Sequence, residues 1–156
     1  MNKLSKSDVS SRAFQVFSDD FATPPQVSLR SGNEIDSYAK PLPFDENEDK
    51  PTDEYVEKFS WGIVHLDPAS WRHYLPILID LSIRKIDGAS NIAVDAFLSS
   101  LRPPDRDPPR FATLSAEQIQ VITDFLDIMA FDEQSAYREE AMAAIQEFWG
   151  PGASSP

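Results

Sequence analysis

The chain has 156 residues, a formal net charge of −12 and no cysteine. The length favours one domain with a real core, and the missing thiols exclude disulfides, cysteine nucleophiles and cysteine-ligated metals. The excess of acidic residues disfavours nucleic acid and anionic membranes as partners, because both are bound through Lys and Arg.

The N-terminal third predicts one helix followed by a long irregular connection. Apolar residues recur at helical spacing over residues 9–21, with Ser7 or Asp8 as the N-cap and two prolines after the helix end. The residues that follow have no sustained periodicity, and Ser-Gly-Asn at 31–33 is a turn signal. We therefore expect a long irregular segment near residues 24–52.

Residues 45–57, DENEDKPTDEYVE, form the densest acidic run of the chain. Its carboxylates belong to Asp45, Glu46, Glu48, Asp49, Asp53, Glu54 and Glu57. Thr52 is a natural N-cap for a short helix that begins at Asp53, where acidic residues suit the helix dipole. The run is either a solvated loop and helix start, or a partner-binding surface that attracts a cationic protein.

The densest apolar run lies between Trp61 and Asp87 and predicts the central helix. Asp67 as N-cap and Pro68 in the first helical position mark its start. Large apolar residues then recur at three- and four-residue spacing, which indicates a buried helical face. Pro76 lies inside this pattern and cannot donate a backbone hydrogen bond, so we expect a kink there.

The last third predicts a short helix, a stiff connector and two longer helices. A serine or asparagine at 90–91 can begin the short helix. The segment RPPDRDPPR, residues 102–110, is either a rigid connector or a recognition loop that presents three arginines. Ser115 and Gln118 form a capping box, and Asp132 is the expected N-cap of the final helix.

Every strong periodic segment has a helical period, so the sequence predicts an all-α fold. We expect a single compact domain of five or six helices over residues 1–150, packed around the central Pro-kinked helix. A brief extended stretch is expected only at 62–66. The small polar residues 151–156 predict a disordered tail.

Patterns for catalysis and metal binding are missing from the sequence. His65 and His73 are its two histidines, and neither belongs to a zinc-binding motif. No serine lies in a GxSxG elbow, and the glycines do not form a phosphate-binding loop. We therefore expect no enzyme activity, no metal and no cofactor.

The motifs WRHYLP at 71–76, Pro-Pro at 103–104 and LSAEQ at 114–118 resemble those of a family of small uncharacterised bacterial proteins. Its members carry an aromatic-Arg-Tyr-Tyr-Leu-Pro helix, a Pro-Pro segment and a Leu-Thr-Pro-Glu-Gln helix start. In this chain a histidine replaces one tyrosine, and Ser-Ala replaces Thr-Pro. The resemblance covers residues 61–149. It implies a bacterial source and a helical domain, and it implies no reaction.

The sequence favours a non-catalytic acidic binding protein. Its size, its charge and the missing catalytic groups fit an immunity-type inhibitor that neutralises a cognate bacterial toxin by direct contact. The acidic run would face a basic toxin. The N-terminal residues lack the apolar core of a secretory signal, so we expect a soluble cytoplasmic protein. The alternative is an enzyme or a small-molecule-binding housekeeping domain whose site the linear sequence does not reveal.

Overall fold

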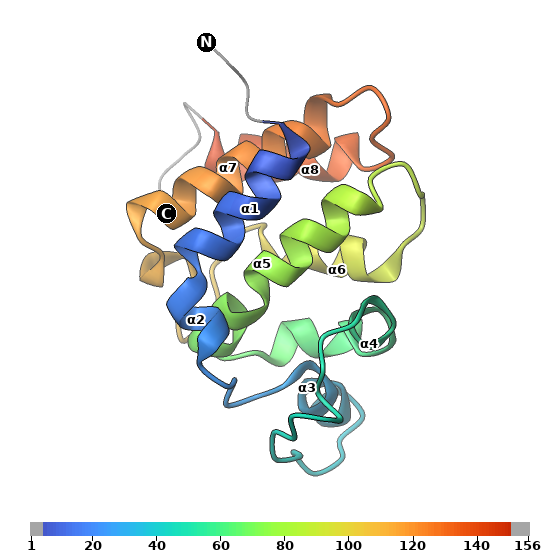
Figure 1. Ribbon diagram of the computed structural model, residues 1–156, viewed down its shortest axis with the longest axis vertical. Coiled ribbons are helices and arrows are strands. Elements are labelled where there is room, and N and C mark those ends of the chain that lie inside the picture. Colours follow the sequence, from blue (N-terminus) through green and yellow to red (C-terminus); the bar gives the residue numbers. More distant parts are fainter. Residues whose placement is uncertain (1–4, 151–156) are drawn as a thin grey trace.

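The computed structural model describes residues 5–150, and every regular element in this range is a helix (Figure 1). The α-helices are α1 (Lys6–Val16), α2 (Ser18–Ala22), α3 (Leu29–Asp36), α4 (Asp53–Lys58), α5 (Pro68–Arg84), α6 (Ile92–Ser100), α7 (Ala116–Phe131) and α8 (Arg138–Ala144). The short 3-10 helices η1 (Ser60–His65) and η2 (Phe111–Thr113) and the π-helical turn η3 (Ile145–Trp149) complete the set. The predicted all-α class is confirmed over these residues, and the predicted tail at 151–156 lies outside them.

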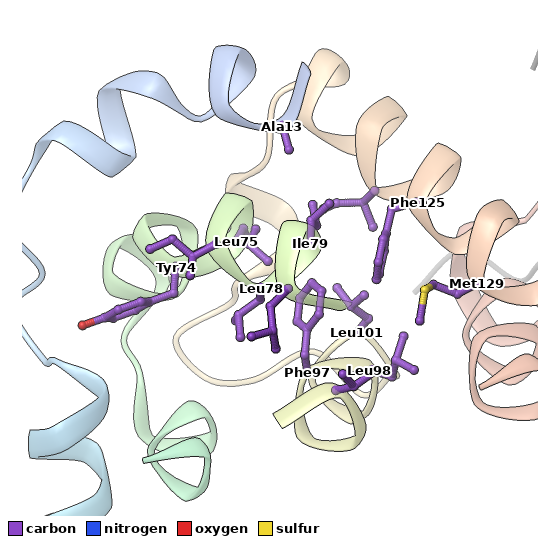
Figure 2. Close-up of a cluster of buried hydrophobic side chains, with 14 of the residues drawn as sticks. Ala13, Tyr74, Leu75, Leu78, Ile79, Phe97, Leu98, Leu101, Phe125 and Met129 are labelled. Carbon is purple, nitrogen blue, oxygen red and sulfur yellow. The ribbon is translucent and has the colours of Figure 1, made fainter. Parts of the chain in front are cut away.

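Helix α5 is the element against which α1, α2, α6 and α7 pack. It begins as predicted, with the Asp67 carboxylate accepting from the Ser70 N–H at 3.3 Å and with Pro68 in the first position. Figure 2 shows its buried side chains meeting those of α6 and α7, among them Leu75, Leu78, Ile79, Phe97, Leu101 and Phe125. It continues through Pro76 as one helix, and the kink stays a prediction. Within the described residues, no helix is long and apolar enough to cross a membrane.

The capping box predicted at the start of α7 is confirmed. The Ser115 hydroxyl accepts from the Gln118 N–H at 3.1 Å, and the Gln118 side-chain oxygen accepts from the Ser115 N–H at 3.0 Å. The amide nitrogen of Gln118 also donates to the Val16 carbonyl at 3.1 Å and to the Asp20 carboxylate at 3.0 Å. One residue therefore both caps α7 and fixes it to the end of α1 and to α2.

Three local predictions of helix limits are wrong. The N-cap of α1 is Ser5, which lies just before the predicted positions. Residues 62–66 are not extended, because most of them belong to η1. Helix α8 begins after Tyr137 rather than at Asp132, which instead ends α7 and forms an ion pair with Lys6 at 3.1 Å.

The segment predicted as irregular, residues 24–52, contains the helix α3. The side chain of Ser28 caps it. Gly32 lies inside this helix, where α3 and η1 touch backbone to backbone. A Cβ atom on Gly32 would lie 2.6 Å from the carbonyl oxygen of Gly62, and one on Gly62 would lie 2.2 Å from that of Leu29. Helix α3 is difficult to predict from hydrophobic periodicity because it has eight residues and only two large apolar side chains, and main-chain atoms make this contact.

Candidate functional site

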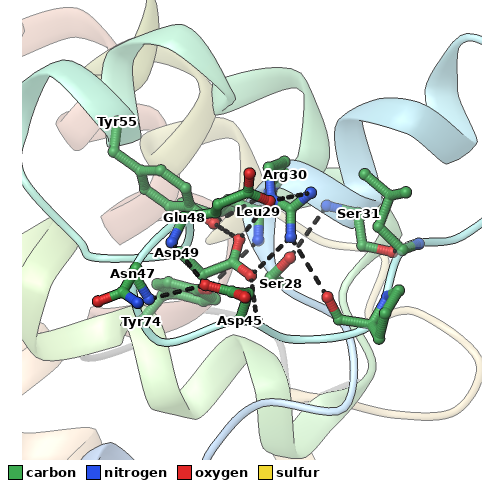
Figure 3. A network of polar contacts seen from close by, with 12 residues as sticks. Ser28, Leu29, Arg30, Ser31, Asp45, Asn47, Glu48, Asp49, Tyr55 and Tyr74 are labelled. Atoms are coloured by element: carbon green, nitrogen blue, oxygen red, sulfur yellow. Dashed lines mark hydrogen bonds and ion pairs between the residues drawn. The ribbon is translucent and has the colours of Figure 1, made fainter.

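A buried carboxylate, that of Asp49, organises the segment between α3 and α4 (Figure 3). Its residue is 2% exposed, and the guanidinium of Arg30 donates to both carboxylate oxygens at 3.1 Å. The Tyr55 hydroxyl donates to Asp49 at 2.6 Å, and the Asp45 N–H donates to it at 2.8 Å. Burial alone would raise the pKa of Asp49, but these hydrogen bonds outweigh it and hold the pKa below its usual value. Asp49 is therefore ionised and fully engaged inside the protein.

Two tyrosines connect this cluster to the first turn of α3. The Arg30 N–H donates to the Tyr55 hydroxyl at 3.2 Å, and the Leu29 N–H donates to the Tyr74 hydroxyl at 3.3 Å. The first N–H groups of a helix have no partner within the helix, so these hydroxyls satisfy them. Burial raises the pKa of Tyr74 to about 12 and that of Tyr55 further, so both hydroxyls stay protonated. The network links α3 and α4 to the central helix.

The loop that leaves α3 is fixed at its near side as well. The Leu42 N–H donates to the Ser31 hydroxyl at 2.9 Å, and the guanidinium of Arg30 donates to the Pro43 carbonyl at 3.3 Å. Figure 1 places α3 and this loop at the lower end of the view, away from α7 and α8. The acidic run is therefore part of a fixed structure rather than a loosely solvated loop.

Three of the seven predicted partner-binding carboxylates, those of Asp49, Asp53 and Glu57, are buried or half-buried. Asp49 is buried, so the expectation of a uniformly exposed acidic surface does not hold there. Asp53 accepts two hydrogen bonds from Arg84, both at 2.8 Å, and Glu57 accepts one from the Asn91 amide at 2.7 Å. These side chains join α4 to α5 and to the start of α6.

The other four predicted carboxylates, those of Asp45, Glu46, Glu48 and Glu54, are exposed. Asp45 accepts from two backbone N–H groups of its own turn, both at 2.9 Å, and Glu48 forms an ion pair with Arg30 at 3.3 Å. Glu46 and Glu54 make no hydrogen bond or ion pair with the residues that the structure describes. The Asp49 cluster thus presents these two carboxylates from a rigid base.

Tyr38, just after α3, combines an unusual backbone conformation with full exposure. Its φ is 61°, in the left-handed region that glycine normally occupies at a helix end. The N–H groups of Tyr38 and Ala39 donate to the carbonyls of Ile35 at 3.0 Å and Glu34 at 2.8 Å, which is a Schellman motif. The side chain is 99% exposed. Tyr38 therefore occupies a position where glycine would be more stable, and its ring packs against no other part of the described structure.

A cleft of about 530 Å³ lies between η1, α6 and residues 102–110. Its apolar lining includes Trp61 and Val64 of η1, Ala96 of α6 and Pro104, and its polar lining includes Arg102, Arg106 and Arg110. The segment RPPDRDPPR is thus one wall of a cleft. Its fold depends on Asp105, whose carboxylate accepts from the N–H groups of Arg106, Arg110 and Phe111 at 2.8 to 3.0 Å.

Arg110 is buried and is one of the residues that line this cleft. Its guanidinium donates to the carbonyls of Ile63 at 2.8 Å and Leu66 at 2.7 Å, at the end of η1. It also lies over the ring of Trp71, 5.6 Å from the centroid. Burial, and after it the charge of Arg106, lower the pKa of Arg110 to about 10, so the group is still cationic at neutral pH.

The other two arginines of the segment are exposed and differ in their partners. Arg102 forms a two-fold ion pair with Glu147. The side chain of Arg106 makes no hydrogen bond or ion pair with any described residue. No sequence signal marks this difference, because the partner of Arg102 lies forty-five residues away along the chain.

The two histidines have different surroundings. His73 is buried, stacks on Phe21 with the ring centroids 5.6 Å apart, and lies 3.1 Å from the Asp20 carbonyl. Burial lowers the pKa of His73. His65 lies 3.0 Å from the Asp36 carboxylate. Between residues 5 and 150, no group of three or more His, Asp or Glu side chains is placed to hold a metal ion.

The comparisons with known proteins give one match. The profile of a family described as "Family of unknown function (DUF6714)" matches residues 5–153. No curated protein and no solved structure matches the chain. Two parts of the described surface are candidate binding sites: the end of the molecule that carries Tyr38 and the acidic run, and the cleft with the arginines.

Proposed function

Since the chain belongs to DUF6714, a family of unknown function, we propose from its surface that it is a non-catalytic binding protein whose partner is another protein. The observation that carries this proposal is Tyr38, with its left-handed backbone and its 99% exposed ring. A non-glycine residue in this conformation costs about 1 kcal/mol or more. Proteins retain such a destabilising backbone conformation mainly at positions where the side chain serves function.

Tyrosine is among the residues that contribute most to protein–protein interfaces. Its large ring buries much apolar area while its hydroxyl still finds a hydrogen-bond partner. Six residues separate Tyr38 from the acidic run, in which Glu46 and Glu54 have no partner within the described residues. An aromatic anchor and carboxylates at one end of the molecule suit a partner that has both a hydrophobic pocket and Lys or Arg side chains.

The narrower form of the proposal is an immunity-type inhibitor that neutralises a cognate bacterial toxin. The net charge of −12 favours a basic partner, because opposite fields speed the encounter. The Asp49 cluster fixes the acidic loop before binding, which reduces the entropy lost in the complex. A toxin is bound tightly when its inhibitor has such a preorganised surface.

Replacing Tyr38 with glycine separates stability from binding. We expect Tyr38→Gly to leave the free energy of unfolding unchanged or to raise it by up to about 1 kcal/mol, because the left-handed strain is relieved. We expect its affinity for the partner to fall by roughly thirtyfold or more, as at an interface hot spot. The partner is first captured from a lysate of the native host with the full chain, and affinity is then measured with both proteins purified.

Tyr38→Phe is the matched control, because it keeps the ring and the strained backbone. It should bind nearly as the unaltered chain does. A partner that binds the Tyr38→Gly protein with unchanged affinity would contradict the proposed surface.

Charge reversal tests the acidic run without disturbing its scaffold. The double variant Glu46→Lys, Glu54→Lys changes two exposed side chains, so each should alter stability by less than about 0.5 kcal/mol. We expect slower association with the purified partner, and the difference should narrow as salt rises. Association rates at two salt concentrations provide the measurement.

A second double variant, Glu133→Lys with Glu139→Lys, makes the same change in net charge on the α7 and α8 side. Equal slowing by both pairs would show that only the total charge matters. In that case the run from Asp45 to Glu57 would not be the docking surface.

A further inference from the structure

The cleft between η1, α6 and residues 102–110 is cationic in an otherwise acidic protein. The charged residues that line it are Arg102, Arg106, Arg110 and Asp36. The Asp36 carboxylate lies 3.0 Å from Nε2 of His65, and Arg102 forms an ion pair with Glu147 of η3. Arg106 and Arg110 remain without a carboxylate bound to either guanidinium among the described residues. The side chains that line the cleft therefore carry a formal positive charge, opposite in sign to the net charge of −12 of the chain.

The two remaining arginines line the same cleft, and their like charges repel. The charge of Arg106 helps to lower the pKa of Arg110, although Asp105 and Asp67 act on it in the opposite direction. Asp105 is occupied by three backbone N–H groups and does not hydrogen-bond either guanidinium. An anion placed beside Arg106 would relieve this repulsion between like charges. Arg110 cannot move away, because four hydrogen bonds to carbonyls hold it.

Part of the lining of the cleft is apolar. Trp61 is 60% exposed and Val64 is also exposed, although both are large and lie on the same short helix. Ala96 and Pro104 line the same space. The volume of about 530 Å³ lies within the range of roughly 300–1,000 Å³ that is usual for small-molecule sites.

We propose that this cleft binds a small organic anion that has an apolar or aromatic body and a single carboxylate, sulfonate or phosphate group. Trp61 and Val64 cover the body, and the planar fork of Arg106 takes the anionic group. An inorganic anion would leave the apolar lining in water, and a neutral apolar molecule would leave Arg106 without a partner. The site shares no residue with the proposed protein-binding surface, so each proposal can fail without the other.

Two dyes of nearly the same shape test the proposal. 8-Anilinonaphthalene-1-sulfonate carries an aromatic body and one sulfonate, whereas N-phenyl-1-naphthylamine has the same body and no charge. Both become fluorescent in an apolar site, so each is titrated into the full-length protein. We expect the sulfonate to bind at least about tenfold more tightly than the neutral dye, because a hydrogen-bonded charge pair contributes that much.

The variants locate the site. Arg106→Ala should lower the affinity for the sulfonate dye by about tenfold and leave the affinity for the neutral dye unchanged. Trp61→Ala should weaken both dyes, because it removes the apolar lining. Arg12→Ala, an arginine of α1 outside the cleft, is the matched control and should change neither. Arg106→Lys keeps the charge without the fork and should fall between Arg106→Ala and the unaltered chain.

Two results would overturn the proposal. One is an Arg106→Ala protein that binds the sulfonate with unchanged affinity, since the dye would then occupy another surface. The other is equal affinity of the unaltered protein for both dyes, since the cleft would then be a purely apolar site. The Arg106 side chain makes no hydrogen bond or ion pair within the described residues, so Arg106→Ala should melt near the temperature of the unaltered chain, which a thermal scan verifies.

Discussion

Asp49→Asn should lower the free energy of unfolding by about 3–5 kcal/mol, although it changes one acidic residue among many in an apparent surface run. The substitution leaves the half-buried Arg30 guanidinium with the exposed carboxylate of Glu48 as its remaining counter-charge. The amide hydrogens of the new asparagine would also face groups that are themselves hydrogen-bond donors. One of these is the Asp45 N–H, whose nitrogen lies 2.8 Å from the Asp49 carboxylate. Urea denaturation at pH 7 measures the loss. Glu54→Gln, an exposed change on the same segment, is the control and should stay within about 0.5 kcal/mol.

The effect of Asp49→Asn should depend on pH in a defined direction. The pKa of Asp49 lies lower in the folded protein than in the unfolded chain, where it is about 3.9. Its contribution is therefore complete above the unfolded value and is lost as the pH falls through that value toward the folded pKa. The stability difference between the unaltered chain and Asp49→Asn should shrink between neutral pH and acid. A difference that is constant with pH would mean that the ionised form of Asp49 is not what stabilises the fold.

Gly62→Ala should destabilise the protein by about 3 kcal/mol, the upper end of the usual cost of overpacking. The new methyl group would lie 2.2 Å from the Leu29 carbonyl oxygen and 2.9 Å from the Asn33 nitrogen. Both atoms belong to the main chain of α3, so no side-chain rotation relieves the overlap. The two elements must separate, and the cap at Ser28 and the Arg30–Asp49 pair would be disturbed with them.

Gly88→Ala is the matched control for this substitution. The closest atom to a methyl group at that position is the Lys85 carbonyl oxygen at 3.6 Å, an ordinary contact. Stability should stay the same or rise by up to about 1 kcal/mol, because the unfolded chain loses freedom. Similar losses from both glycines, measured by urea denaturation, would show that α3 and η1 are not in backbone contact.

Features encoded by near neighbours could be predicted from the sequence. The caps at Thr52, Asp67, Asn91 and Ser115 are all in place, since each depends on a side chain and an N–H group two or three residues later. The Asp80–Arg84 pair, one helical turn apart, also forms at 2.9 Å. The core of α5 followed from the spacing of its apolar residues.

Features that join distant parts of the chain could not be predicted. The acidic run looked uniform because the partner that draws Asp49 inward, Arg30, lies nineteen residues away. Helix α3 is short and has only two large apolar residues, Leu29 and Ile35, and its contact with η1 includes main-chain atoms at Gly32. The cleft combines residues from Asp36 to Arg110, and the left-handed backbone of Tyr38 has no signature in residue type. The candidate sites therefore emerged only from the fold.

The Asp49 cluster has a consequence for how such a protein can diversify. Arg30, Asp49 and Tyr55 stabilise the fold, whereas Glu46 and Glu54 take no part in the cluster. All of these residues except Arg30 lie in one short stretch of sequence. Mutations at the two outer positions are nearly neutral for stability, so selection can act there on recognition alone. A lineage that keeps Arg30, Asp49 and Tyr55 can therefore change its binding specificity by single substitutions at Glu46 and Glu54, and each variant along the way stays folded.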